Sequence, residues 1–355
     1  MNRLPRILLW VLLALGLLLI IIHLILPPIA LNYINRQMED MGDYRGEVQS
    51  LDLAWWRGGA SLGGVRIETQ DDRIQVPILD AASVDVDISW SDLFARRGIV
   101  ATATIHEPVM NYIGDVDIGD PPEPDAPDWR IEVREMMPIT FEHVRIVNGQ
   151  ASYRMYGTEP PIHLYVTGMD AIVRNLTNRP EGEQRRTADF EATGVVMDEG
   201  SLELSGRIDP LSDLDFDIQA RITDVPLTSL NDVTEAYGNF DFVEGWGDVV
   251  VELEAQDRRL DGYIRPLLRD ASIFNLEQII EDEDKGFLRG AWEALVGAGR
   301  RLLENPEEDQ FATEVELSGS LDDAELSPFQ AFLAILQNAF VEAFTADYGR
   351  ETNDG

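Results

Sequence analysis

Apolar and polar residues alternate along most of this chain, and the alternation predicts β-strands. It is clearest in three segments: 83–90, 214–222 and 249–253. Successive side chains of a strand point to opposite faces, so each of these segments has one apolar face and one polar face. Antiparallel sheets with one face in water have this pattern. We therefore expect a mainly β fold, built on a mostly antiparallel sheet.

The start of the chain has a different pattern, an uninterrupted apolar run from residue 7 to residue 26. A helix of about 20 residues is ~30 Å long, which matches the hydrocarbon core of a bilayer. We expect an N-terminal segment at 1–6, a transmembrane helix at 7–26 and a stalk helix at 27–45 that packs on the first strands. The alternative is a cleaved signal peptide, but no small-x-small cleavage site follows the run.

Basic residues near the apolar run predict its orientation. Arg3 and Arg6 lie directly before it, whereas Arg36 and Arg45 lie ten or more residues beyond its end. Positive charges close to a membrane helix favour the cytoplasmic side. We expect the N-terminus in the cytoplasm and residues 46–355 on the opposite side of the membrane.

Turn and helix patterns divide the exported part. Asn148-Gly149 separates two alternating runs and predicts a β-hairpin, and the acidic, proline-rich stretch 115–128 predicts a solvated loop or linker. Apolar residues recur at helical spacing in 284–304 and at about 328–346. The second helix has an apolar stripe, which consists of Phe329, Phe332, Leu333, Leu336, Phe340 and Phe344. This helix either packs against the sheet as ordinary core or closes a groove.

Composition excludes several classes of function. The formal net charge of −37 repels nucleic acid, and the absence of cysteine excludes disulfides and thiolate chemistry. His106, His143 and His163 have no metal-binding spacing, and no nucleophile elbow or phosphate-binding loop is present. We predict no catalytic site, no cofactor and no metal. An unrecognised hydrolase remains an alternative to the two functions described at the end of this subsection.

Several segments resemble AsmA-like proteins, in particular their smaller relatives of unknown function. The opening of that family is similar to residues 31–68 (LNYINRQMEDMGDYRGEVQSLDLAWWRGGASLGGVRIE). Its recurrent strand pair is similar to ITFEHVRIVNGQASYRMY followed by LYVTGMDAIVRNLTN. Its C-terminal portion is similar to residues 203–266 and 311–344. The resemblance covers most of the chain and rests on strand and turn patterns.

This resemblance implies a bacterial inner-membrane anchor and a periplasmic β structure, built as an elongated, curved, partly open barrel or groove with an apolar inner face. It also implies a role in lipid trafficking and envelope maintenance, including outer-membrane biogenesis, since large family members resemble bridge-like lipid transfer proteins. The present chain is much shorter than those members. Some fourteen strands at ~4.8 Å spacing give ~70 Å of groove, which is too short to connect two membranes alone.

Two functions are compatible with these patterns. In the first, an apolar β groove handles phospholipid or another acyl-chain lipid. In the second, the domain is a structural or adaptor protein that binds an envelope protein without carrying lipid. The candidate groove residues share the apolar faces of the predicted strands: Val84, Val86, Ile88, Phe216, Ile218, Val249, Val251 and Leu253.

Overall fold

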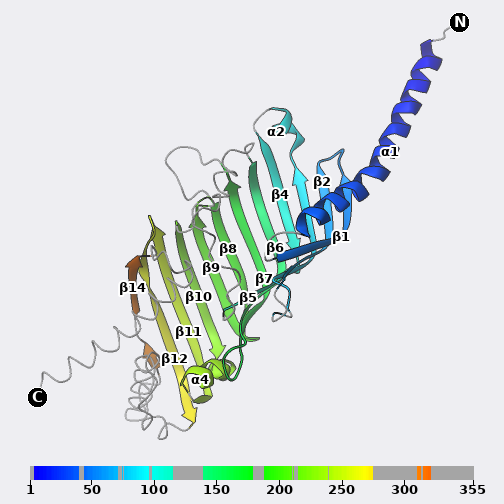
Figure 1. Cartoon of the computed structure of the whole chain (residues 1–355). Helices are drawn as coiled ribbons and strands as arrows, with labels where there is room; N and C mark the ends of the chain where they lie inside the picture. The colour runs from blue at the N-terminus through cyan, green and yellow to red at the C-terminus, as the bar shows by residue number, and fades with distance from the viewer. Residues whose placement is uncertain are drawn as a thin grey trace, which may run out of the picture.

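The computed structural model contains one long helix followed by one large sheet (Figure 1). It describes residues 4–39, 44–70, 74, 76–95, 98–114, 139–178, 188–209, 211, 215–238, 240–274, 310–312 and 315–320. The acidic loop expected at 115–128 and the helices expected at 284–304 and 328–346 lie outside these residues. So do the candidate groove-closing side chains from Phe329 to Phe344.

The expected mainly β architecture is confirmed, because the described residues form a 14-stranded, mostly antiparallel sheet with few helices. The helices are α1 (Leu4–Met38), α2 (Trp90–Phe94), the short 3-10 helix η1 (Leu227–Leu230) and α4 (Asn231–Gly238). The first seven strands are β1 (Tyr44–Ala54), β2 (Gly59–Thr69), β3 (Leu79–Ile88), β4 (Ile99–His106), β5 (Val109–Ile113), β6 (Ile139–Met155) and β7 (Ile162–Thr177). The others are β8 (Ala188–Val196), β9 (Gly200–Ile208), β10 (Phe216–Pro226), β11 (Asp241–Gln256), β12 (Arg259–Phe274), β13 (Gln310–Ala312) and β14 (Val315–Ser320).

The order of the strands follows the sequence almost throughout. The order is β1-β2-β3-β4-β6-β7-β8-β9-β10-β11-β12-β13, and β14 pairs with β12 beside β13. The exception is β6, which pairs in parallel with β4 over its first half and with β5 over its second half. Because neighbours along the chain are neighbours in the sheet, the molecule is elongated, with α1 at one end and β12–β14 at the other (Figure 1).

Residues with positive φ interrupt the long strands without ending them. Asn148 (φ 53°) and Gly149 lie inside β6, where the register with β7 shifts. The hairpin expected at Asn148-Gly149 is therefore wrong. A β-bulge and a two-residue hairpin turn both favour left-handed backbone, so the same dipeptide suits either one. A bulge bends the strand, and this bend lets a 17-residue strand stay within a curved sheet.

Helix α1 is one continuous helix through Pro27 and Pro28, whereas the sequence predicted a transmembrane helix and a separate stalk. Each proline removes one backbone hydrogen bond, but the residues beyond them are held by the sheet. Leu31, Ile34 and Met38 pack against the buried side chains of β1, β2 and β3. This contact stabilises the last turns of the helix and compensates for the lost hydrogen bonds.

Asn35 joins α1 to the edge of the sheet. Its side-chain nitrogen donates to the carbonyl of Val48 (2.9 Å), and its oxygen accepts from the N–H of Val48 (2.8 Å). Val48 belongs to the edge strand β1 and is 1% exposed. Asn35 thus occupies the place of a neighbouring strand and protects an edge that would otherwise present unpaired backbone groups.

Asn35→Ala is expected to expose that edge locally. Leaving buried backbone groups without a partner costs about 1–3 kcal/mol, so the Val48 amide should exchange with solvent about tenfold faster or more. Hydrogen exchange read at Val48 measures this. Asn231→Ala is the matched control, since Asn231 makes the same pair of bonds with Phe242 and should leave Val48 unchanged. Unaltered exchange at Val48 in Asn35→Ala would contradict the assignment.

Candidate functional site

An unbroken row of apolar residues crosses the whole sheet. Cross-strand partners share a face, and each member of the row is the direct partner of the next. The row consists of Leu51, Leu62, Val84, Ile105, Ile146, Ala171, Ala192, Leu204, Ala220, Val251, Ile264 and Val315. Eleven intervals at ~4.8 Å give a length of about 50 Å.

A second row runs beside the first, two residues further along each strand. It consists of Leu53, Ala60, Val86, Ala103, Val144, Val173, Phe190, Gly206, Ile218, Leu253, Gly262 and Leu317. Neither row contains a polar side chain. Together they form a continuous apolar strip on one face, which we call the apolar floor.

The structure places all eight candidate groove residues on this face, and all eight are half-buried. Val84 and Val251 belong to the first row, and Val86, Ile218 and Leu253 to the second. The remaining three lie two positions along their strands from members of these rows: Ile88, Phe216 and Val249.

Beside the floor lies a cavity of about 930 Å³ with an almost entirely apolar lining. Its lining comes from strands β2, β3, β5, β6, β7, β8, β10, β11 and β12 and from η1. One wall is again a row of direct partners, which consists of Ile67, Leu79, Met110, Ala151, Val166 and Val196. The volume is near the upper end of the ~300–1,000 Å³ range that is usual for ligand pockets.

Only one of the eight residues predicted from sequence lines this cavity, namely Val249, which pairs with Ile222 and Pro266 of the lining. Sequence reasoning missed the row from Ile67 to Val196. Those residues lie near strand ends, beyond positions where the alternation of apolar and polar residues shifts by one residue. Beyond such a position, counting every second residue no longer identifies the side chains of one face. Gly64 (φ 62°) is one such position, because Leu62 and Val65 pack in one cluster although they are three residues apart.

Polar side chains of the lining form hydrogen bonds with residues outside it. The side-chain nitrogen of Asn111 donates to the carbonyl of Pro77 (2.8 Å), and its oxygen accepts from Arg154 (3.0 Å). The hydroxyl of Tyr165 donates to Asp198 (2.7 Å), and this hydrogen bond raises the pKa of the tyrosine. Tyr112 and Tyr153 stack with ring centroids 5.8 Å apart. The cavity thus offers an occupant apolar surface rather than a set of converging polar groups.

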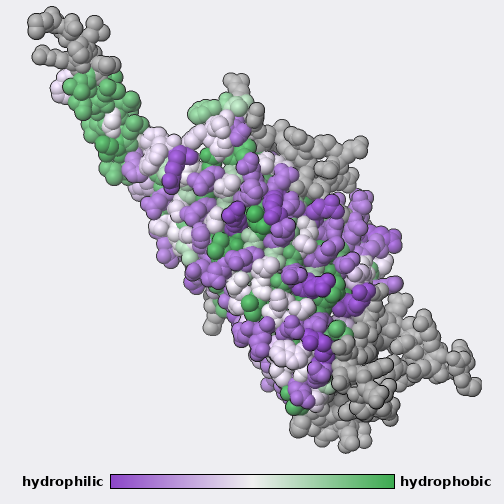
Figure 2. Space-filling view, turned by 180° about the vertical axis from the view of Figure 1, so that it is seen from behind, coloured by the Kyte–Doolittle hydropathy of each residue, from purple (hydrophilic) through white to green (hydrophobic). Residues whose placement is uncertain are grey.

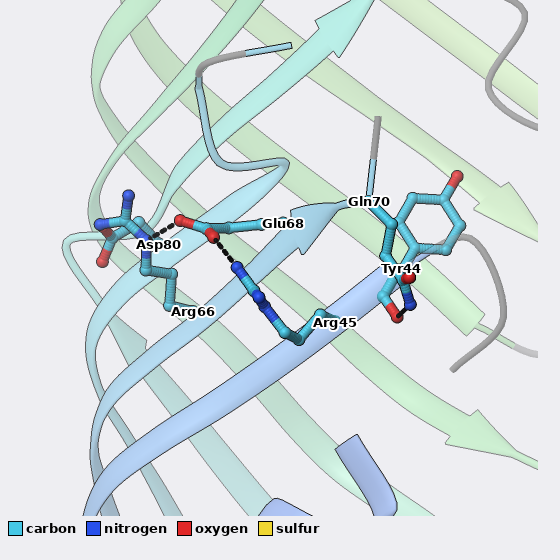
Figure 3. Close-up of polar contacts among 6 residues, drawn as sticks. All are labelled: Tyr44, Arg45, Arg66, Glu68, Gln70 and Asp80. Carbon is cyan, nitrogen blue, oxygen red and sulfur yellow. Dashed lines mark hydrogen bonds and ion pairs between the residues drawn. The ribbon is translucent and has the colours of Figure 1, made fainter. Parts of the chain in front are cut away.

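The opposite face of the sheet is polar. Glu191, Gln219 and Glu252 lie on it, and a view from behind shows hydrophilic side chains predominating over the strands (Figure 2). Ion pairs lie there, as in the group around Glu68 of β2, which accepts from Arg66 of the same strand and from Arg45 of the neighbouring strand β1 (3.1 Å) (Figure 3). These two hydrogen bonds lower the pKa of Glu68. One face is therefore suited to water and the other to hydrocarbon.

No family model matches the chain, and no curated protein does. Function is therefore inferred from the chemistry of the groove itself. In the part of the chain that the structure describes, no cluster of three His, Asp or Glu side chains is arranged to hold a metal ion.

An ion-pair cluster braces the strands at the cavity, whose lining includes Asp248. Arg269 of β12 donates to both oxygens of Asp248 on β11 (3.1 and 2.9 Å) and to Asp224 of β10 (2.7 Å). Burial alone would raise the pKa of Asp248, but the hydrogen bonds from Arg269 and from the Asp224 N–H outweigh it and lower that pKa. Asp224 (φ 57°) lies at the bulge where β10 bends toward η1. The cluster therefore holds this bend in place.

Arg269→Met is expected to destabilise the domain by about 1–3 kcal/mol at neutral pH, since charged hydrogen bonds are lost and two carboxylates remain together. A depressed carboxyl pKa contributes stability above the unfolded pKa of ~3.9, and the contribution disappears as pH falls through the folded pKa. The difference in Tm between wild type and variant should therefore shrink below about pH 4. Melting curves from pH 7 to pH 3 measure this.

Arg207→Met is the control variant. It breaks a more exposed ion pair with Asp217 (2.8 Å) and should cost less than about 1 kcal/mol. A pH-independent difference for Arg269→Met would contradict the assignment.

Proposed function

We propose that this chain is a membrane-anchored protein that handles lipid, with its apolar groove holding acyl chains. The observation that carries the proposal is the apolar floor, which runs across twelve strands beside a cavity of about 930 Å³. Burying a methylene group gains ~0.8 kcal/mol without any specific contact. A groove of this kind therefore favours acyl chains as a class over any one headgroup.

The position of α1 supports this role. It is long and apolar enough to span a membrane. Its last turns lie on the apolar face, where Leu31, Ile34 and Met38 pack against the same buried cluster as Val84 of the apolar floor. A lipid that leaves the bilayer beside α1 would meet apolar surface at once, instead of crossing water. We infer that lipid passes between the groove and the bilayer at this end.

The proposed setting is the bacterial inner membrane, with the sheet in the periplasm. The arginines before the apolar run support this orientation, as does the resemblance of residues 31–68 to AsmA-like proteins. A phosphatase that is active only outside the cytoplasm, fused after Gly355, should be active. An inactive fusion in a correctly inserted protein would contradict the orientation.

Mass spectrometry of the purified full-length chain tests the proposal. The chain should retain phospholipid or another acyl-chain lipid after extraction and extensive washing in a short-chain detergent. A chain in which only residues 4–26 of α1 are replaced by an unrelated membrane helix, so that the turns packed on the sheet are kept, should retain it too, since the groove holds the lipid. If neither protein carries lipid but both bind an envelope protein, the adaptor function replaces the present proposal.

A further inference from the structure

Large aromatic side chains are exposed at the α1 end of the sheet. Phe94 is 79% exposed, Trp56 60% and Trp90 37%. Trp90 and Phe94 belong to α2 and stack with ring centroids 5.8 Å apart, and Trp56 lies in the turn between β1 and β2. In the view from behind, α2 protrudes from the body of the sheet (Figure 2).

The turn and α2 form one surface. The N–H of Ile88, two residues before α2, donates to the carbonyl of Gly58 in the turn (2.9 Å). Gly58 also approaches the indole of Trp90 so closely that an added Cβ would lie 3.1 Å from its nitrogen. We call the exposed side chains Trp56, Trp90 and Phe94 the aromatic edge.

A contact with α1 sets the level of this edge relative to a membrane. The rings of His23 and Trp56 lie 5.3 Å apart, edge to face. His23 is close to the end of the apolar run at residue 26, about 5 Å from it at ~1.5 Å per residue. When α1 spans a bilayer, Trp56 is therefore at the depth where the hydrocarbon meets the headgroups. Tryptophan is enriched at this depth, because its ring is apolar and its N–H is polar.

We propose that the aromatic edge inserts into the interface of the same bilayer that α1 crosses, and so docks the sheet on the membrane surface. The inference rests on the proposed anchor and adds a second point of attachment. A sheet attached through α1 alone would tilt together with that helix in the bilayer, whereas α1 and α2 together fix its orientation. The strongly acidic chain gains little from anionic headgroups, so aromatic insertion is the means by which it can approach lipid closely.

Spin labels on the cysteine-free chain test the docking. Phe94→Cys and Val243→Cys are each labelled with a nitroxide in the full-length chain, which is then incorporated into phospholipid nanodiscs. Val243 is the matched control, since it is 56% exposed but lies in β11, far from α1 along the sheet. Oxygen concentrates in lipid and a nickel chelate stays in water, so their relative collision rates report depth.

The ratio of oxygen to nickel collisions should be several-fold higher at position 94 than at position 243. Equal, water-like ratios at both positions in chains that are incorporated through α1 would overturn the docking while leaving the anchor intact. Failure of the chain to enter the nanodiscs would overturn the anchor and, with it, the docking.

Discussion

Val249→Glu is expected to remove most of the bound lipid and to leave the domain folded. Val249 lines the cavity beside Ile222, and a carboxylate there replaces apolar surface that an acyl chain would cover. Losing contact with about four methylene groups costs about 3 kcal/mol, roughly a hundredfold in affinity. Val249 is half-buried, so water reaches the new charge, and its cost stays below that of an unpaired charge in a closed core.

Lipid per protein, measured by mass spectrometry, and the melting temperature are read together. Gln219→Glu provides the control, because it adds the same charge to an exposed position on the polar face of the neighbouring strand. It should keep its lipid and lower Tm only slightly, because the added carboxylate lies opposite Glu252 in water. A Val249→Glu variant that melts normally and keeps its lipid would count against the groove, and one that fails to fold would indicate a closed core.

Phe242→Ala is expected to cause the largest loss of stability, about 3–5 kcal/mol, because it empties a buried aromatic site. Phe242 is 5% exposed and packs edge to face on Phe240, with ring centroids 5.2 Å apart. The same cluster contains Leu227, whose helix η1 contributes to the lining of the cavity. The variant should therefore loosen the groove wall as well as lower Tm.

Chemical denaturation measures the free energy of unfolding for this variant. The neighbouring substitution Val243→Ala is a close control, since Val243 is 56% exposed and should cost less than about 0.5 kcal/mol. Similar losses for both variants would show that Phe242 is not part of a packed core.

The strands were predictable because apolar and polar residues alternate along them. This alternation has a physical cause, since one face of each strand meets water and the other does not. Aspartates between the valines of β3 mark that difference in the sequence. The pairing of strands was not predictable, since alternation gives the faces of a strand but not its neighbour. The parallel pairing of β6 with both β4 and β5 depends on contacts between residues far apart in the chain.

Prediction from local sequence failed where the same left-handed backbone conformation occurs both in hairpin turns and in bulges within a strand. Asn148-Gly149 predicted a hairpin but forms a bulge within β6, and Asp261-Gly262, which also has a turn composition, lies within β12. The true turn before β12 contains Asp257 (φ 49°) and Arg258 (φ 63°), which few rules of turn composition would select. Pro27 and Pro28 misled for a different reason, since packing of α1 on the sheet outweighs the local cost of proline.

The cavity was only partly predictable. Alternation placed Val249 on the correct face, but the row from Ile67 to Val196 follows strand ends where bulges reverse the phase. A residue such as Met110 shows its place in the lining only when its partners Leu79 and Ala151 are known. The groove is thus a property of the register of the whole sheet rather than of any one segment.

Photo-crosslinking in living cells tests the central claim most directly. A benzophenone amino acid replaces Val249 on the apolar face or Gln219 on the polar face of the full-length chain. After irradiation, the mass of the intact protein is measured by mass spectrometry. We expect an added mass that corresponds to a phospholipid or another acyl-chain lipid at position 249, and none at position 219. Lipid adducts at neither position, or equally at both, would contradict a lipid-holding groove.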